Sequence, residues 1–361
     1  MRTVCKLLIF LAFLAVASAL QSIPLDRSNG IHKHARMASA GQQQPPPPET
    51  IREEQVQLPA GLSMQVLSAI PNHESEKPVL LFLHGSFHGA WCWAEHFMPF
   101  FESKGYPVVA ISWRGTGGTF AGEGVKKVKI MEHVTDLAFI LKVLPRLAGR
   151  ESVKPVVICH SFGGLAVMKY LELYPEKVSS LSGIVTMCSV PPSGNGKLTM
   201  RYLRRSFRDS WKITSGFARK KCLTDATLCR QLFFGGEKIV LEDGKVEDYG
   251  VSDEELERYQ GYFARDSTAT IDLINLAKQL PSLKATDGKA PFVEGLPPCL
   301  VLGASDDFIV DSEGVKETAT YFGLDEPVIV DSPHDVMLGG KFSNAATSLD
   351  LWLQEAVILT E

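Results

Sequence analysis

Short, continuous apolar runs alternate along this chain with longer segments in which apolar residues recur every three to four positions. A run of that kind is typical of a strand that is buried on both faces of a sheet. We expect such strands at residues 79–83, 108–111, 156–159, 181–187, 299–303 and 327–330. Helical periodicity lies between and after them, at residues 91–101, 130–147, 165–173, 313–321 and 344–357. The alternation predicts an α/β fold with a mainly parallel central sheet and helices on both faces.

The alternation is interrupted between residues 191 and 281. This block of about ninety residues is charged, helical in pattern and without a clear buried strand, and it is too long for an ordinary loop. We therefore expect residues 191–281 to form a helical cap, inserted into a core made of residues 51–190 and 282–361.

One stretch of the predicted cap, residues 198–212, is amphipathic. Its apolar and basic side chains fall on opposite faces of a helix: Met200, Leu203, Phe207 and Trp211 against Arg201, Arg204, Arg205, Arg208 and Lys212. Such a helix fits peripheral contact with a membrane surface. It also fits a cap helix that packs its apolar face over the active site and leaves its basic face in solvent. The acidic run at residues 242–257, a partner for the basic face, favours the second interpretation.

The beginning of the chain predicts targeting rather than fold. Residues 1–19 have the layout of a secretory signal peptide, with two basic residues, an apolar run at residues 7–16 and the small-residue cleavage site Ala17-Ser18-Ala19. An uncleaved membrane anchor is the alternative, although the run is short for a membrane span. Residues 20–50 are polar, poor in acids and rich in proline near their end, so we expect a disordered linker or transit-like segment there.

This order of segments resembles the bipartite presequence of algal secondary plastids, with Leu20 where phenylalanine is more usual. The resemblance implies a plastid location, and secretion is the alternative. Six cysteines follow the signal peptide, and only Cys222 and Cys229 look like a plausible disulfide pair. The sequence also has no Asn-X-Ser/Thr glycosylation site. Both observations favour a compartment that tolerates free thiols.

Composition narrows the range of partners. The formal net charge of −4 gives no reason to expect a nucleic acid. A length of 361 residues with 45% hydrophobic residues allows a large core. The histidines and cysteines are not clustered at the spacings of a metal site. We therefore expect no metal and no other cofactor.

Residues 156–164 carry the first sign of chemistry. The apolar strand Val156-Val157-Ile158 leads into Cys159-His160-Ser161-Phe162-Gly163-Gly164, and a helical pattern follows directly. A sharp turn of small residues between a strand and a helix is typical of a nucleophile elbow, which exposes a serine at the carboxyl end of a sheet. Cys159 stands where glycine is usual, but it is still a small residue. A buried strand that ends in an ordinary turn is the alternative.

Two later strand ends supply partners for Ser161. Active sites of open parallel sheets lie at the carboxyl ends of the strands. Asp306 and Asp307 follow one apolar run, and His334 follows the next. A serine needs a base to become a good nucleophile, and the base needs a carboxylate to hold its tautomer. We assign these roles to Ser161, His334 and Asp306, three residues after Gly303, with Asp307 as the rival acid.

The remaining catalytic need is a pair of N–H donors for the oxyanion of a tetrahedral intermediate. The N–H after the nucleophile belongs to Phe162. The second donor should come from the loop after His84-Gly85, which makes it the N–H of Ser86. We expect substrate contacts from the neighbouring residues Phe87, Trp91 and His160, although His160 also fits a position packed under the elbow.

These four local matches, in the order loop, Ser, Asp, His, resemble the α/β-hydrolase superfamily over residues 51–361. The stretches at residues 84–93 and 332–338 are similar to those of plant and cyanobacterial serine hydrolases. The resemblance implies a serine esterase or lipase that cleaves a small-molecule or lipid ester with an apolar acyl or alkyl group, through an acyl-enzyme.

Two alternatives on the same fold remain open: a lyase like hydroxynitrile lyase, and a non-catalytic small-molecule receptor. Epoxide and haloalkane hydrolysis fit less well, because relatives with those activities place aspartate where Ser161 stands.

Overall fold

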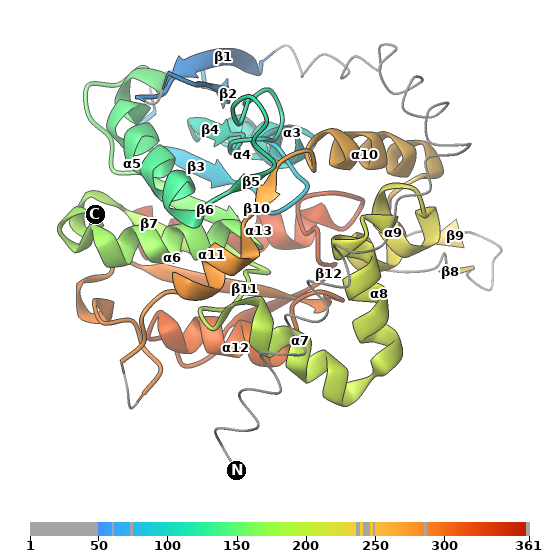
Figure 1. The fold of residues 1–361 in the computed structure, drawn as a ribbon. Helices are drawn as coiled ribbons and strands as arrows, with labels where there is room; N and C mark the ends of the chain where they lie inside the picture. Colours follow the sequence, from blue (N-terminus) through green and yellow to red (C-terminus); the bar gives the residue numbers. More distant parts are fainter. Residues whose placement is uncertain are drawn as a thin grey trace. The chain divides into compact units, whose positions relative to one another are not determined.

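The computed structural model describes the part of the chain drawn in colour in Figure 1. The described residues are 50–59, 61–72, 75–235, 239–240, 246–247, 250–284 and 287–358. The predicted signal peptide and all but the last residue of the transit-like segment lie outside them, so both remain predictions. Among the helices of the described residues, none is long and apolar enough to span a bilayer.

The fold is built on an eight-stranded sheet with the strand order β1-β2-β4-β3-β6-β7-β11-β12. The first two strands pair antiparallel, β2 is also antiparallel to β4, and all later neighbours are parallel. This confirms the predicted mainly parallel sheet. The strands are β1 (Arg52–Gln57), β2 (Ser63–Ala69), β3 (Leu80–Leu83), β4 (Val108–Ile111), β6 (Val156–His160), β7 (Gly183–Met187), β11 (Cys299–Asp306) and β12 (Val328–Pro333).

Two hydrophobic clusters cover the two faces of this sheet. Successive side chains of a strand point to opposite faces, and Phe82 and Leu81 of β3 accordingly belong to different clusters. On the Phe82 face lie α4 (Phe97–Ser103) and α13 (Phe342–Trp352). On the Leu81 face lie α5 (Ile130–Leu147), α6 (Gly163–Leu173) and α12 (Ser312–Tyr321). Helices therefore cover both faces, as the sequence predicted.

One predicted helix is divided. The periodicity at residues 91–101 predicts a single helix, but the structure has the short α3 (Trp91–Ala94) and then α4. Pro99 lies inside the first turn of α4. Its ring would clash with the carbonyl four residues earlier in a continuous helix, at Glu95. The break between α3 and α4 falls at Glu95 and His96 for this reason.

The chain between β7 and β11 forms the helical insertion (Figure 1). Its helices are α7 (Gly194–Arg205), α8 (Phe207–Ala218), α9 (Ala226–Phe233), α10 (Asp253–Arg265) and α11 (Leu273–Lys278). Two pairs of short strands accompany them: β8 (Ile239–Val240) with β9 (Val246–Glu247), and β10 (Thr270–Ile271) with β5 (Lys127–Val128). The second pair joins the end of the insertion to the core.

The predicted amphipathic helix over residues 198–212 is two helices. Ser206 has an extended backbone, with φ −158° and ψ 113°, and its hydroxyl accepts a hydrogen bond from the Asp209 N–H. Serine favours this capping position over a helix interior, because its side chain satisfies a backbone donor that the new helix leaves free. The chain therefore turns at Ser206 between α7 and α8.

Asp266, at the end of α10, fastens the insertion to the core. Its buried carboxylate accepts hydrogen bonds from the Trp91 indole N–H at 2.8 Å and from the Gly117 N–H at 2.7 Å. Arg265 supplies the neighbouring positive charge at 2.7 Å. Trp91 begins α3, after β3, and Gly117 lies in the loop that follows β4, so one side chain connects three segments distant in sequence.

We expect Asp266→Ala to lower the free energy of unfolding by about 3 kcal/mol, because it leaves the buried Trp91 N–H and the partly buried Gly117 N–H without an acceptor. Urea denaturation measures this loss. The control is Asp325→Ala, at an exposed carboxylate, which should stay within about 0.5 kcal/mol of the parent chain. Equal stability of the two variants would contradict the assignment.

Candidate active site

Ser161 occupies a strained turn between β6 and α6. Its φ of 50° lies in the left-handed region, which a non-glycine residue adopts at a cost of about 1–3 kcal/mol. The Ser161 N–H donates to the carbonyl of Met187 at 3.0 Å, and its own carbonyl accepts from the Val190 N–H at 3.1 Å. The end of β7 and the loop that follows it thus hold the backbone on both sides of the serine, while the side chain stays free for chemistry.

The residues around Ser161 are small because other segments of the same chain approach them closely. A Cβ on Gly163 would lie 2.8 Å from the carbonyl oxygen of His84. A Cβ on Gly164 would lie 1.9 Å from the Ser189 hydroxyl, so the close neighbour of this glycine is the loop after β7. Cys159 takes the position where glycine is usual, and its buried thiol donates to the carbonyl of Val185 at 3.3 Å.

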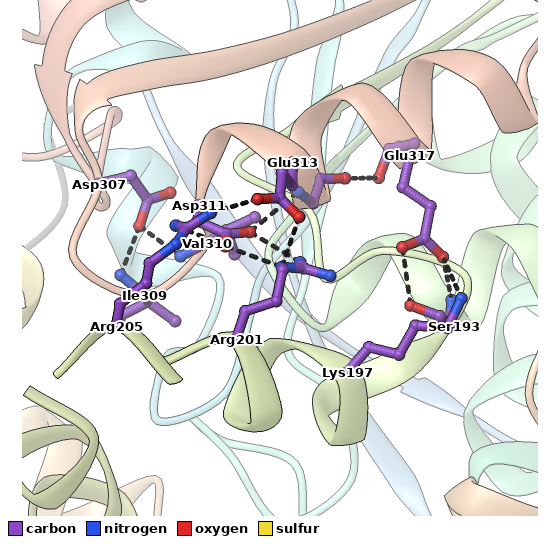
Figure 2. A network of polar contacts seen from close by, with 12 residues as sticks. Ser193, Lys197, Arg201, Arg205, Asp307, Ile309, Val310, Asp311, Glu313 and Glu317 are labelled. Carbon is purple, nitrogen blue, oxygen red and sulfur yellow. Dashed lines mark hydrogen bonds and ion pairs between the residues drawn. The ribbon is translucent and has the colours of Figure 1, made fainter. Parts of the chain in front are cut away.

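His334 connects Ser161 to an acid. Its Nε2 lies 3.2 Å from the Ser161 Oγ, and its Nδ1 lies 2.8 and 2.9 Å from the two carboxylate oxygens of Asp307. Nδ1 therefore donates to Asp307, which leaves Nε2 free to accept the serine proton. Figure 2 shows Asp307 with Ile309 and Val310, whose N–H groups both donate to its carboxylate at 2.8 Å.

The prediction that Asp306 is the acid is wrong, because the structure places Asp307 on His334. Asp306 is the exposed last residue of β11, where it pairs with Pro333 of β12. The register between the two strands shifts between Ala304 and Asp306. A spacing counted from Gly303 assumes a regular strand end, and a shift of one residue reverses the face to which each side chain points.

The environment of His334 suits a base. Burial disfavours its charged form, but the charge and hydrogen bond of Asp307, together with the charge of Asp335, outweigh burial, so the pKa of His334 is raised above the ordinary 6.5. His84, which is also buried but faces no carboxylate, behaves differently. Burial lowers its pKa to about 3, and its Nε2 accepts the Trp113 N–H at 2.9 Å. His84 is therefore a neutral structural residue that shapes the loop after β3.

That loop lies directly beside the elbow. A Cβ on Gly85 would be 2.8 Å from the Ser161 Cβ, so only glycine allows this approach. The backbone N–H groups of Ser86 and Phe162 donate to no group among the described residues. Two free N–H groups on the segments that flank the nucleophile are what an oxyanion site needs.

A buried hydrogen-bonded pair, His88 and Asp335, supports this loop. The His88 Nε2 lies 2.9 Å from a carboxylate oxygen of Asp335, and its Nδ1 lies 2.7 Å from the Ser86 carbonyl. Both oxygens are acceptors, so both hydrogen bonds exist together only if His88 carries two protons or Asp335 carries one. The pair joins the loop that carries Ser86 to the loop that carries His334. Asp335 directly follows His334 in the chain, and its hydrogen bond crosses to another loop.

The three residues predicted to bind substrate have different surroundings. Phe87 points toward the insertion, and its ring centroid lies 5.3 Å from that of Phe217 in α8. Trp91 donates its indole N–H to Asp266 and stacks on Tyr259, so it holds the insertion in place. His160 is fully buried, and its Nε2 lies 3.0 Å from the His334 carbonyl. Substrate contact therefore fits Phe87, whereas Trp91 and His160 position other parts of the site.

Aromatic side chains of the insertion close over the site. Phe233 lies at the centre of this group, with ring centroids 6.4 Å from His334, 5.6 Å from Phe217 and 4.9 Å from Phe263. The sequence predicted a cap over the site without identifying these residues. A separate surface cavity, lined in part by Ile70, Pro107 and Arg150, opens near the amino-terminal ends of β4 and β6, away from Ser161.

Cys188 is a neighbour of the acid that sequence analysis passed over. Its thiol, an Asp307 oxygen and a His334 nitrogen all lie within 4.8 Å of one another. Burial, and then the Asp307 charge, raise the pKa of Cys188 well above 9, so the thiol keeps its proton beside the carboxylate. Cys188 directly follows β7, and the rule that places active sites at strand ends would have found it.

Two groups of potential metal ligands surround His334. One contains His160 and Asp335, and the other contains Cys188 and Asp307. Both use His334, whose two ring nitrogens already face Asp307 and Ser161. A metal ion bound to His334 would therefore displace its hydrogen bond to Asp307 or to Ser161.

Comparison with known proteins identifies the family. The model of the alpha/beta hydrolase family matches residues 80–340, which include the whole site described above. Among solved structures, the epoxide hydrolase VrEH1 from Vigna radiata covers 85% of this chain and 98% of its own, with a TM-score of 0.57 and 18% identity. At that identity the similarity shows the fold.

Curated relatives match over shorter lengths. Epoxide hydrolase 1 from Caenorhabditis elegans is 24% identical over 244 residues, which cover 66% of this chain and 56% of the relative. Methylesterase 1 from Arabidopsis thaliana is 32% identical over 108 residues, which cover 30% of this chain and 39% of the relative. The chain thus spans little more than half the length of the first relative and about two fifths of the second.

The two candidate acids can be separated by NMR titration of the His334 ring. We expect a pKa above 6.5 in the parent chain, because the Asp307 charge favours the imidazolium. Asp307→Asn removes that charge and leaves burial to act, so the pKa should fall below 6.5. Asp306→Asn is the matched control and should leave the titration unchanged. A larger shift with Asp306→Asn would return the acid to that position.

Proposed function

We propose that this chain, which belongs to the alpha/beta hydrolase family, hydrolyses carboxylic esters through an acyl-enzyme on Ser161. The observation that carries the proposal is the continuous hydrogen-bonded series from the Ser161 Oγ through His334 to Asp307. Family membership supports a hydrolase. The identity of the bond that is cleaved is inferred from the residues of the site.

Each residue has a defined role in the proposed reaction. His334 accepts the Ser161 proton at Nε2 while the serine oxygen attacks the ester carbonyl. Asp307 holds the Nδ1 proton and stabilises the imidazolium that forms. The N–H groups of Ser86 and Phe162 would stabilise the oxyanion. His334 then gives its proton to the departing alkoxide, and a water molecule activated in the same way releases the acid from Ser161.

The nucleophile itself favours esters over epoxides. A serine that opened an epoxide would form an ether, which water does not readily hydrolyse, and the enzyme would stop after one turnover. A serine that attacks an ester forms another ester, which the same His334 can hydrolyse. The name of the methylesterase relative agrees with this choice, and the name of the epoxide hydrolase relative does not.

The aromatic group over the site favours an apolar substituent on the ester. Phe87 and Phe217 face one another between the loop after β3 and α8, and Phe233 lies beside His334. These side chains offer apolar contacts but few polar groups that would recognise a sugar or a charged metabolite. We therefore propose an acyl or alkyl chain as the part of the substrate that the cap holds.

We expect turnover of p-nitrophenyl esters to rise with acyl chain length, because longer chains bury more apolar surface against the cap. Ser161→Ala should lower the rate by about a thousandfold or more, because it removes the nucleophile. Ser86→Ala is the matched control: the proposed role of Ser86 uses only its backbone, so its activity should stay near that of the parent chain.

Ester turnover that survives in Ser161→Ala would contradict the nucleophile. A folded parent chain without ester turnover would contradict the hydrolase and direct attention to a receptor or a lyase. A rate that falls steadily with chain length would contradict the apolar cap.

A further inference from the structure

Helices α7 and α8 present large apolar side chains to solvent. Phe207 is 81% exposed, Trp211 is 54% exposed and Leu203 is 37% exposed. The cations Arg204, Arg208, Lys212 and Arg219 lie on the same two helices or immediately after them. We call these seven residues the aromatic–basic surface. A group of large apolar side chains exposed on one part of a surface often marks a site of interaction with a protein or a membrane.

The opposite face of α7 is fixed to the core by ion pairs. Figure 2 shows Arg201 and Arg205 directed at Asp311 and Glu313, at the start of α12. The Arg201 guanidinium makes two bonds to Asp311, at 2.7 and 2.8 Å. Further along, Ser193 binds Glu317 through its N–H and its hydroxyl.

This arrangement reverses one interpretation of the sequence. A cap helix that packs its apolar face inward would bury Phe207 and Trp211 and leave the arginines in solvent. The structure instead turns Arg201 inward and leaves both aromatic side chains exposed. Arg201 and the more exposed Arg205 both pair with the core. The partner expected was the acidic run at residues 242–257, of which residues 242–245 and 248–249 lie outside the described residues.

The charge of the surface identifies the kind of partner. Residues 203–221 contain seven lysines and arginines but only one acidic residue, although the whole chain has a net charge of −4. Among the described residues, Arg204, Arg208, Lys212 and Arg219 form no ion pair. Arg219 instead lies over the Trp211 ring, 4.7 Å from its centroid. The surface combines aromatic side chains with cations that have no counter-charge.

We propose that the aromatic–basic surface docks on an anionic phospholipid bilayer. Phenylalanine and tryptophan enter the boundary between headgroups and acyl chains, and the surrounding cations attract anionic headgroups. A protein partner would need acidic and apolar groups in one matching arrangement, whereas a bilayer supplies both without a specific shape. The docking stands on the exposed residues alone and does not depend on ester hydrolysis.

Docking would bring the active-site cap to the lipid. Helix α8 carries Phe207 and Trp211 at its beginning and Phe217, which contacts Phe87, near its end. Lys212 lies over the ring of Phe308, next to the acid Asp307, at 5.8 Å. One helix thus connects the proposed lipid contact to the site. That the bilayer also supplies the substrate rests on the proposed function, whereas the docking itself does not.

Sedimentation of the full chain with vesicles of phosphatidylglycerol and phosphatidylcholine tests the proposal. We expect binding to anionic vesicles and much weaker binding to vesicles of pure phosphatidylcholine. Phe207→Ser and Trp211→Ser should each weaken the binding about tenfold, from the apolar surface that they remove. Leu351→Ser is the matched control, because this leucine is also 54% exposed but lies outside the aromatic–basic surface.

A charge series separates lipid attraction from nonspecific adhesion. Replacing Arg204, Arg208 and Arg219 by glutamine should weaken binding to anionic vesicles about fivefold for each charge. Replacing the exposed residues Lys142, Lys154 and Lys177 by glutamine is the control and should have little effect. The apolar run at residues 7–16 is present in every variant, so its contribution cancels in these comparisons.

Fluorescence locates the contact. Trp91, Trp93 and Trp113 are buried and Trp352 is partly buried, whereas Trp211 is half-exposed. Anionic vesicles should shift the tryptophan emission to shorter wavelength, and brominated lipids should quench it. Trp211→Phe should still bind the vesicles but should lose most of the emission shift and most of the quenching.

Equal vesicle binding by the parent chain, Phe207→Ser and the arginine variant would overturn the proposal. So would equal binding to neutral vesicles. Self-association of the parent chain that Phe207→Ser abolishes, without vesicle binding, would assign the surface to a second copy of this chain instead.

Discussion

The left-handed turn at Ser161 is the constraint on which the rest of the site depends. A φ of 50° is unfavourable for a non-glycine residue, and this backbone conformation persists here because contacts with the surrounding segments hold it. The loop after β3 approaches the elbow at Gly85 and Gly163. Met187, at the end of β7, and Val190, in the loop that follows, hold the serine backbone. The same contacts that maintain the strain set the free N–H groups of Ser86 and Phe162 beside the serine hydroxyl.

Buried polar pairs then keep the loops of the site in register. Asp307 accepts hydrogen bonds from two backbone N–H groups in addition to its bond with His334. These two bonds fix the carboxylate independently of the histidine. Below the site, the bond between His88 and Asp335 connects the loop after β3 to the loop that carries His334. Removing one partner of this pair would cost about 1–3 kcal/mol, because it leaves a buried polar group without its hydrogen bond. A change in the geometry of the site would therefore require breaking hydrogen bonds that also stabilise the fold.

Much of the fold and part of the site could be predicted from the sequence. The apolar runs identify the parallel strands, and the residues that follow them include Ser161 and His334, because parallel strands end at one edge of the sheet. What failed depends on local geometry. A register shift at Ala304 moved the acid to Asp307, Pro99 divided a helix, and Ser206 divided another. The outward direction of Phe207 depends on ion pairs with Asp311 and Glu313, which are more than a hundred residues from α7 in the sequence and which no local pattern reveals.

The most direct test of the account is mass spectrometry of the chain quenched with acid during turnover of a p-nitrophenyl ester. The proposed mechanism predicts one acyl group on the peptide that contains Ser161. The peptide should gain the mass of the released acid less one water, and Ser161→Ala should show no such adduct. An acyl group on another residue, or sustained turnover with no adduct on the chain under conditions where the released alcohol shows a burst, would contradict it.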